Sequence, residues 1–125
     1  MSYKVTIRSV GRGWTDEKET CGEVLQTPDG VSLKYTLDGD DCTLTVGNGR
    51  AVQERKGSQP VCIEFIEGSH TDCVIGSGSF CGSYKIFTKS LKFVSGSSGF
   101  KLALEYENGS DTELIKLILT ALEKK

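Results

Sequence analysis

The sequence lacks an excess of either charge, over its whole length and in each half. Its 125 residues include 15 lysines and arginines and 17 aspartates and glutamates, which gives a net charge of −2. Dividing the chain after Cys62 leaves 8 basic and 9 acidic residues in the first part, and 7 and 8 in the second. Proteins that capture nucleic acid electrostatically need a clustered basic surface. We therefore expect no nucleic-acid partner.

The chain also lacks a long apolar segment. The best candidate, Leu114 to Leu122, is interrupted by Lys116 and is too short to cross a bilayer. The first residues alternate between polar and apolar types and contain no apolar core of a secretion signal. The sequence therefore predicts a protein without a membrane partner and without export.

Cysteine and histidine do not stand in the spacing of known frameworks. The cysteines number 5, none of them forms a Cys-x-x-Cys pair, and His70 is the only histidine. Zinc sites and disulfide frameworks depend on such paired spacing, so we expect no metal and no cofactor. Most of the cysteines should instead be free, buried and apolar in behaviour. Free thiols and the missing signal together predict a cytoplasmic location.

Two clusters suggest chemistry, but each lacks a necessary part. The Gly/Ser-rich segment from Gly76 to Gly82 resembles a phosphate loop, yet a strand and not a helix should follow it, so we expect a structural loop. His70 and Asp72 share one face of a strand, and two ligands are too few for a metal site. Cys73 points to the other face, where His70 cannot serve as its base. We therefore name no catalytic residue, and an enzyme that uses His70 or a cysteine is the least favoured alternative.

Acidic side chains also fail to form a recognisable site. Asp38, Asp40 and Asp41 lack the twelve-residue pattern of a calcium loop, so we expect a solvated hairpin tip there. Glu105 and Glu107 lie on the outward face of a strand, where a carboxyl group is not desolvated enough for acid catalysis.

Alternation of apolar and polar residues is the main structural signal. From Phe100 to Tyr106 every second residue is large and apolar, which is typical of a strand with one buried face. The 15 glycines mark turns about every 8 to 12 residues, the spacing of a sandwich or closed barrel. A polar turn is expected at Thr15–Lys18. Further strands are expected over residues 3–10, 19–26, 31–37, 42–46, 50–56, 61–67, 71–75, 84–88 and 91–93.

The segment after Leu114 has two interpretations. Asn108-Gly109 favours a two-residue hairpin turn, which would fold the segment back on the preceding strand. Its apolar residues also recur at helical spacing among good helix formers, so a helix, or a strand that becomes helical near Ala121, is the alternative. We favour a strand.

Five short motifs carry a resemblance to a known family: Leu33-Lys34-Tyr35, Arg55-Lys56-Gly57, Phe65-Ile66-Glu67-Gly68, Phe87-Thr88-Lys89-Ser90-Leu91 and Leu104-Glu105-Tyr106. In this order they resemble the YwiB-like family of small bacterial proteins, over nearly the whole chain. The resemblance implies a lipocalin-like (calycin-type) β-barrel. It implies no activity, because the family has no established catalytic or binding residues to carry over.

These observations predict an all-β protein with one domain spanning residues 1–125. We expect an antiparallel up-and-down barrel of about eight to ten strands, with a helical turn at the C-terminus as an open alternative. Such a barrel has room for filling side chains or one small ligand. The expected function is non-catalytic binding of a small apolar or amphipathic molecule in the barrel interior or mouth.

Four polar or amphipathic residues in otherwise apolar strands are the candidates for that ligand site: Tyr35, Arg55, Thr88 and Tyr106. Their alternative roles are structural, with the tyrosines in the core and Arg55 on the surface. A protein-interaction or dimerisation module is the alternative function, with residues 50–56 as an exposed edge strand. The sequence is compatible with a monomer or a homodimer.

Overall fold

Ten antiparallel strands form one closed barrel in the computed structural model. This number is the upper limit of the about eight to ten strands that the sequence predicts. The structure describes residues 2–57, 60–77, 80–108 and 113–124. Each strand pairs with its neighbour in the sequence, and β10 pairs with β1 to close the ring. The strands are β1 (Ser2–Gly11), β2 (Trp14–Thr27), β3 (Gly30–Leu37), β4 (Asp40–Gly47), β5 (Arg50–Lys56), β6 (Val61–Ile66), β7 (His70–Ser77), β8 (Phe80–Gly96), β9 (Gly99–Asn108) and β10 (Glu113–Glu123).

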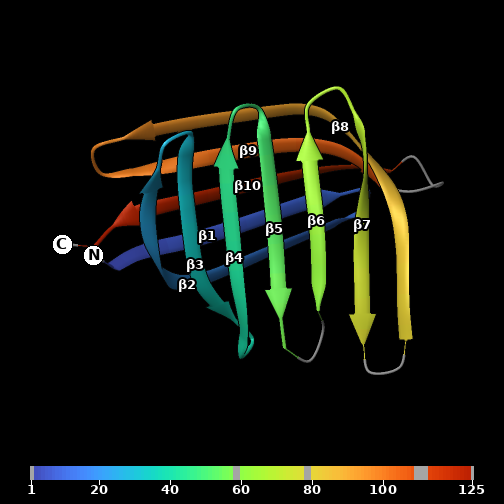
Figure 1. The fold of residues 1–125 in the computed structure, drawn as a ribbon, viewed down its shortest axis with the longest axis horizontal. Helices are drawn as coiled ribbons and strands as arrows, with labels where there is room; N and C mark the ends of the chain where they lie inside the picture. The colour runs from blue at the N-terminus through green and yellow to red at the C-terminus, as the bar shows by residue number, and fades with distance from the viewer. Residues whose placement is uncertain (1, 58–59, 78–79, 109–112, 125) are drawn as a thin grey trace.

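The barrel is flattened into two layers whose strands cross at a steep angle, as Figure 1 shows. Strands β3 to β7 run vertically in that view, and β1, β9 and β10 run horizontally behind them. The long strands β2 and β8 belong to both layers, because one part of each pairs with one layer and the rest pairs with the other. Strand β8 bends between the layers, and its register shifts between Thr88 and Ser90. A bulge of this kind is how a strand turns such a corner.

The alternation of side chains sorts the barrel into an inside and an outside. In β3, Val31, Leu33 and Tyr35 are buried, and the residues between them are not. The same rhythm in β4, β9 and β10 supplies most of the remaining core. The buried side chains form one apolar cluster inside the ring, and this burial is the main stabilising term.

The segment after Leu114 is a strand, so the favoured interpretation is confirmed and the C-terminal helical turn is wrong. β10 pairs with β9 on one side and with β1 on the other. Ile115, Leu119 and Ala121 point inward and are buried, while Ile118 and Leu122 are exposed outside. Two complete ladders outweigh the helix propensity of this composition. No helix of the described residues is long and apolar enough to span a membrane.

Three connections differ from expectation. Gly11 pairs with Trp14, so Thr15–Lys18 lies within β2 and not in a turn. Gly76 pairs with Cys81, so most of the expected loop up to Gly82 is strand, although residues 78–79 lie outside the described residues. Asn108 pairs with Glu113, so a two-residue turn at Asn108-Gly109 is wrong, and the connection itself lies outside the described residues. In each case pairing with a neighbour extends a strand through residues whose local chemistry favours turns.

Closure of the ring also corrects the expected edge strand. β5 has the predicted bounds, Arg50–Lys56, but it pairs with β4 and with β6. Its backbone groups are therefore used inside the sheet, and it cannot accept an added strand from a partner.

Replacing Gly99 with alanine should destabilise the barrel by about 2 kcal/mol. Gly99 has φ +155°, and a Cβ atom there would overlap with the carbonyl oxygen of Ala121 on β10. The matched control is Gly96→Ala at the other side of the same hairpin, where no atom lies within 4 Å of an added Cβ. Urea denaturation should show little loss for the control. Equal losses in both variants would contradict this explanation.

Candidate functional site: a cavity inside the barrel

The register brings one row of inward-facing side chains together across the vertical layer. Tyr35 on β3 is opposite Cys42 on β4, Cys42 is opposite Arg55 on β5, and Arg55 is opposite Val61 on β6. Residues opposite each other in antiparallel strands have Cβ atoms about 5 Å apart. The row therefore gathers a phenol, a thiol and a guanidinium at one place in an otherwise apolar interior.

A cavity of about 250 Å³ lies beside this row, inside the barrel. Tyr35, Cys42, Gln53, Arg55 and Tyr106 are its polar or amphipathic lining residues. Its apolar wall includes Leu44, Ile63, Phe65, Leu102, Leu104 and Leu119. A cavity of about 150 Å³ is large enough to hold benzene. The interior is therefore filled in part and leaves room for one small molecule.

The strongest contact at the site is an ion pair between β5 and β4. Arg55 Nε donates to Asp40 Oδ2 at 2.8 Å, with side-chain exposures of 22% for Arg55 and 6% for Asp40. Gly57 makes this arrangement possible, because a Cβ atom at Gly57 would overlap with the Asp40 carboxylate. The pair holds one positive and one negative charge together, largely away from solvent, and Arg55 is the member of the pair that lines the cavity.

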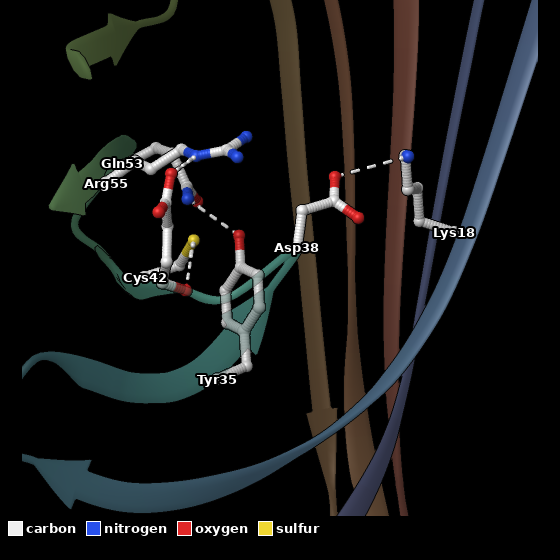
Figure 2. Close-up of polar contacts among 7 residues, drawn as sticks. Lys18, Tyr35, Asp38, Cys42, Gln53 and Arg55 are labelled. Carbon is white, nitrogen blue, oxygen red and sulfur yellow. Dashed lines mark hydrogen bonds and ion pairs between the residues drawn. The ribbon is translucent and has the colours of Figure 1, made fainter. Parts of the chain in front are cut away.

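A second polar contact joins Tyr35 of this row to Gln53, the neighbouring inward-facing residue of β5. Gln53 Nε2 donates to the hydroxyl oxygen of Tyr35 at 2.6 Å. Figure 2 shows Tyr35, Gln53 and Arg55 pointing toward one another from β3 and β5. Cys42 lies beside them, with its thiol 3.8 Å from the backbone oxygen of Asp40. These contacts fix the orientation of the polar groups before any ligand binds.

Burial sets the protonation of these groups at neutral pH. It raises the pKa of the Tyr35 phenol and of the Cys42 thiol, so both remain protonated. The hydrogen bond to Asp40 raises the pKa of Arg55, which remains charged. A protonated thiol is a poor nucleophile, so Cys42 is suited to packing and hydrogen bonding and not to covalent catalysis.

Tyr106 on β9 lines the same cavity from the other layer. Its ring packs edge-on against Phe65, with ring centres 5.1 Å apart. Its pKa is raised to about 12, mainly by burial. The phenol of this cavity-lining residue is therefore neutral at neutral pH.

Thr88 is opposite Tyr106 in the pairing of β8 with β9, but it does not line the cavity. Its side chain is 0% exposed, and its Oγ1 has no hydrogen-bond partner among the residues that the structure describes. Its backbone binds the β6–β7 connection through Gly68 and Ser69. The structure thus brings Tyr35, Arg55 and Tyr106 around one cavity. Thr88 lies outside this cavity, paired with Tyr106 at the bulge of β8.

Stability should fall as the pH rises above 10, and Tyr106→Phe should reduce this loss. An unfolded tyrosine ionises near pH 10, whereas Tyr106 in the folded protein holds its proton until about pH 12. Between these values the folded state binds more protons, so stability falls by about 1.4 kcal/mol per pH unit for this group. Urea denaturation at pH 8 and pH 11 should show a loss about 1.4 kcal/mol larger in the wild type than in Tyr106→Phe. Equal losses would show that Tyr106 is solvated.

The other sequence candidates lie outside the cavity. His70 is exposed and packs on Phe87 with ring centres 4.8 Å apart, while Cys73 is buried on the opposite face of β7, as expected. Asp72 is exposed and pairs with Lys85. Within the described part of the chain, no group of three potential ligands could hold a metal ion.

The cysteines divide into two kinds. Cys42 and Cys73 are buried as expected, but Cys21 and Cys62 are exposed, so the prediction of burial is correct for only half of these. All four are free. The side chain of Cys81 lies outside the described residues.

Asp40, Gln53 and Cys42 belong to the site although the sequence pattern did not single them out. The expected hairpin tip at Asp38–Asp41 is wrong for Asp40, which is 5% exposed. Asp38 and Gly39 form the turn with positive φ, and Asp40 is the first inward residue of β4. Asp40, Cys42 and Leu44 are every second residue of one strand. This alternation is the sequence signal that could have placed Asp40 inside the barrel.

A larger hollow of about 740 Å³ lies over the outer faces of β2 to β5. Its lining includes Glu23, Lys34, Asp41, Glu54 and Lys56, so charges of both signs are mixed. Such a surface offers no apolar enclosure and no single complementary charge. The interior cavity is therefore the better candidate site.

Comparison with known proteins identifies the fold. No protein-family model matches the sequence, and no curated protein matches it. Among solved structures, the crystal structure of the ywiB protein from Bacillus subtilis matches with a TM-score of 0.69 and covers 99% of this chain and 91% of that chain. The chain has a YwiB-like fold. The likeness to YwiB is at 13% sequence identity, so it shows the fold alone and transfers no residue roles.

Proposed function

We propose that this protein is a non-catalytic, cytoplasmic module that binds one small, partly apolar molecule inside its barrel, in the manner of the lipocalin-like (calycin) proteins. The observation that carries the proposal is the 250 Å³ cavity, which is walled by apolar side chains and has fixed polar groups at one end. Ligand sites usually combine an apolar lining with a few oriented polar groups. The free cysteines of the described chain support a reducing compartment.

The cavity also accounts for the placement of the polar groups better than a structural role does. Replacing an ion pair with apolar side chains is often neutral or stabilising in a protein core. A core that served only for stability therefore has no need of Asp40 and Arg55 beside an unfilled space. A role in recognition explains why the pair borders the cavity.

Filling the cavity should abolish binding without unfolding the barrel. Leu44 is 2% exposed and lines the cavity, so Leu44→Trp should place its indole in the open space. Butylbenzene, an uncharged apolar probe, should shift the backbone amide signals of Leu44 and Ile63 in the wild type. We expect at least a tenfold weaker response in Leu44→Trp.

The matched control for this experiment is Thr45→Trp. Thr45 is the next residue on β4 and is exposed on the outer face. This variant should bind the probe as the wild type does. Binding that persists in Leu44→Trp, or that is lost in Thr45→Trp, would place the probe outside the barrel and overturn the proposal.

A further inference from the structure

The charge of Arg55, which lines the cavity, is already paired with a carboxylate before a ligand enters. Arg55 and Asp40 are in contact at 2.8 Å, and the carboxylate is the more deeply buried of the two, at 6% exposure. Their opposite charges sum to zero at this end of the cavity. A ligand that brought a carboxylate beside Arg55 would also bring it close to Asp40, where the site would then hold an excess negative charge. An uncompensated charge among apolar, poorly solvated side chains is unfavourable.

The same groups still offer hydrogen-bond donors to a ligand. The bond to Asp40 uses Nε of Arg55, and no other hydrogen bond joins its guanidinium to a side chain or backbone group of the described chain. Figure 2 shows both terminal nitrogens at the far end of the side chain, away from the β5 backbone. Tyr106 lines the cavity from β9, and its hydroxyl group likewise has no partner among the described residues. The site is therefore neutral in charge but rich in N–H and O–H donors.

A neutral site that is rich in donors selects a neutral ligand with an acceptor. A carbonyl oxygen accepts hydrogen bonds from a guanidinium without adding charge, and bonds to a charged donor are stronger than those between neutral groups. Given the binding function proposed above, we propose that the cavity takes an uncharged molecule whose apolar body ends in a carbonyl group at Arg55, as in a carboxamide or ketone. The carboxylate of the same shape is disfavoured.

The volume bounds the size of this molecule. The cavity of about 250 Å³ exceeds the roughly 150 Å³ of a cavity that can hold benzene, so it suits a body of roughly a dozen non-hydrogen atoms. 4-Phenylbutanamide and 4-phenylbutanoate are a matched pair of this size, and they differ only in their charge and end group. Butylbenzene has the same apolar body and no acceptor.

Titration of the isotope-labelled protein with each of the three compounds at pH 7.5 tests the inference. We expect the amide to bind at least tenfold more tightly than the carboxylate and more tightly than butylbenzene. If butylbenzene binds and the amide has no advantage over the carboxylate, the barrel is a binding module but its selectivity is not the one inferred. If none of the three compounds binds, the proposed function itself fails.

Asp40→Asn gives a test of opposite sign in the same site. This change leaves Arg55 charged without its carboxylate partner, so the carboxylate compound should gain at least tenfold in affinity while the amide changes less than threefold. An unchanged ratio of the two affinities would overturn the inference. The double variant Asp40→Asn/Arg55→Met removes both charges, and it should lose the preference for the amide over butylbenzene. If this preference remains, Arg55 is not the donor.

Discussion

Replacing Leu33 with alanine should lower the free energy of unfolding by about 3 to 4 kcal/mol. Leu33 is 0% exposed at the centre of β3, between Val24 on β2 and Leu44 on β4. It does not line the interior cavity, so the alanine variant loses buried methyl groups and creates a new void in the packed part of the core. Urea denaturation should show a lower midpoint with an unchanged slope.

Leu25→Ala is the matched control for this prediction. Leu25 lies on β2 in the same hairpin, but its side chain is 68% exposed. The substitution is chemically identical and removes almost no buried surface, so we expect a change within about 0.5 kcal/mol. A larger loss in Leu25→Ala than in Leu33→Ala would mean that the inside and outside of this hairpin are exchanged relative to the structure, and similar losses would contradict the difference in burial.

The strands that the sequence predicts well are those with one wet and one buried face. β3 was expected over residues 31–37 and spans Gly30–Leu37, and β5 has the expected bounds. In both, a neighbour pairs along each edge and the barrel interior takes every second side chain. In β3 these two conditions produce the apolar period of two, whereas β5 shows it only weakly because Gln53 and Arg55 face inward.

The strands that the sequence predicts poorly are those that serve both layers. The first part of β2, including Thr15–Lys18, pairs with β1 but is polar, and most of it is exposed. Without a buried face a strand has no alternation, so its composition is that of a loop. β8 spans Phe80–Gly96 as one strand, whereas the sequence divided it near Lys89, where the register shifts at the bulge.

The sequence predicts a residue of the candidate site only where the alternation of side chains within one strand is enough to show which residues face inward. Tyr35, Arg55 and Tyr106 were recognised as polar groups at positions of an apolar rhythm, and all three line the cavity. Asp40 was missed because its neighbours Gly39 and Asp41 look like the rest of a solvated turn. Its contact with Arg55 depends on which residue of β5 lies opposite Cys42, and no single strand encodes that register.

Arg55→Met should destabilise the protein by about 3 kcal/mol. Methionine retains the apolar stem that packs beside the cavity but removes the guanidinium from Asp40. The Asp40 side chain, at 6% exposure, then lies in a poorly solvated position without its ion pair to Arg55. The single variant Asp40→Asn should lose only about 1 kcal/mol, since Arg55 is 22% exposed and its charged end can turn toward water. Urea denaturation of both variants measures this asymmetry.

The double variant Asp40→Asn/Arg55→Met decides whether the loss comes from the unbalanced charge. It removes both charges of the pair, so it should recover to within about 1 kcal/mol of the wild type. The two substitutions are then strongly non-additive, as expected for side chains in direct contact. Additive losses would show instead that each side chain acts through its own packing. In that event Asp40 would not neutralise Arg55, and the argument for an uncharged ligand would lose its electrostatic basis.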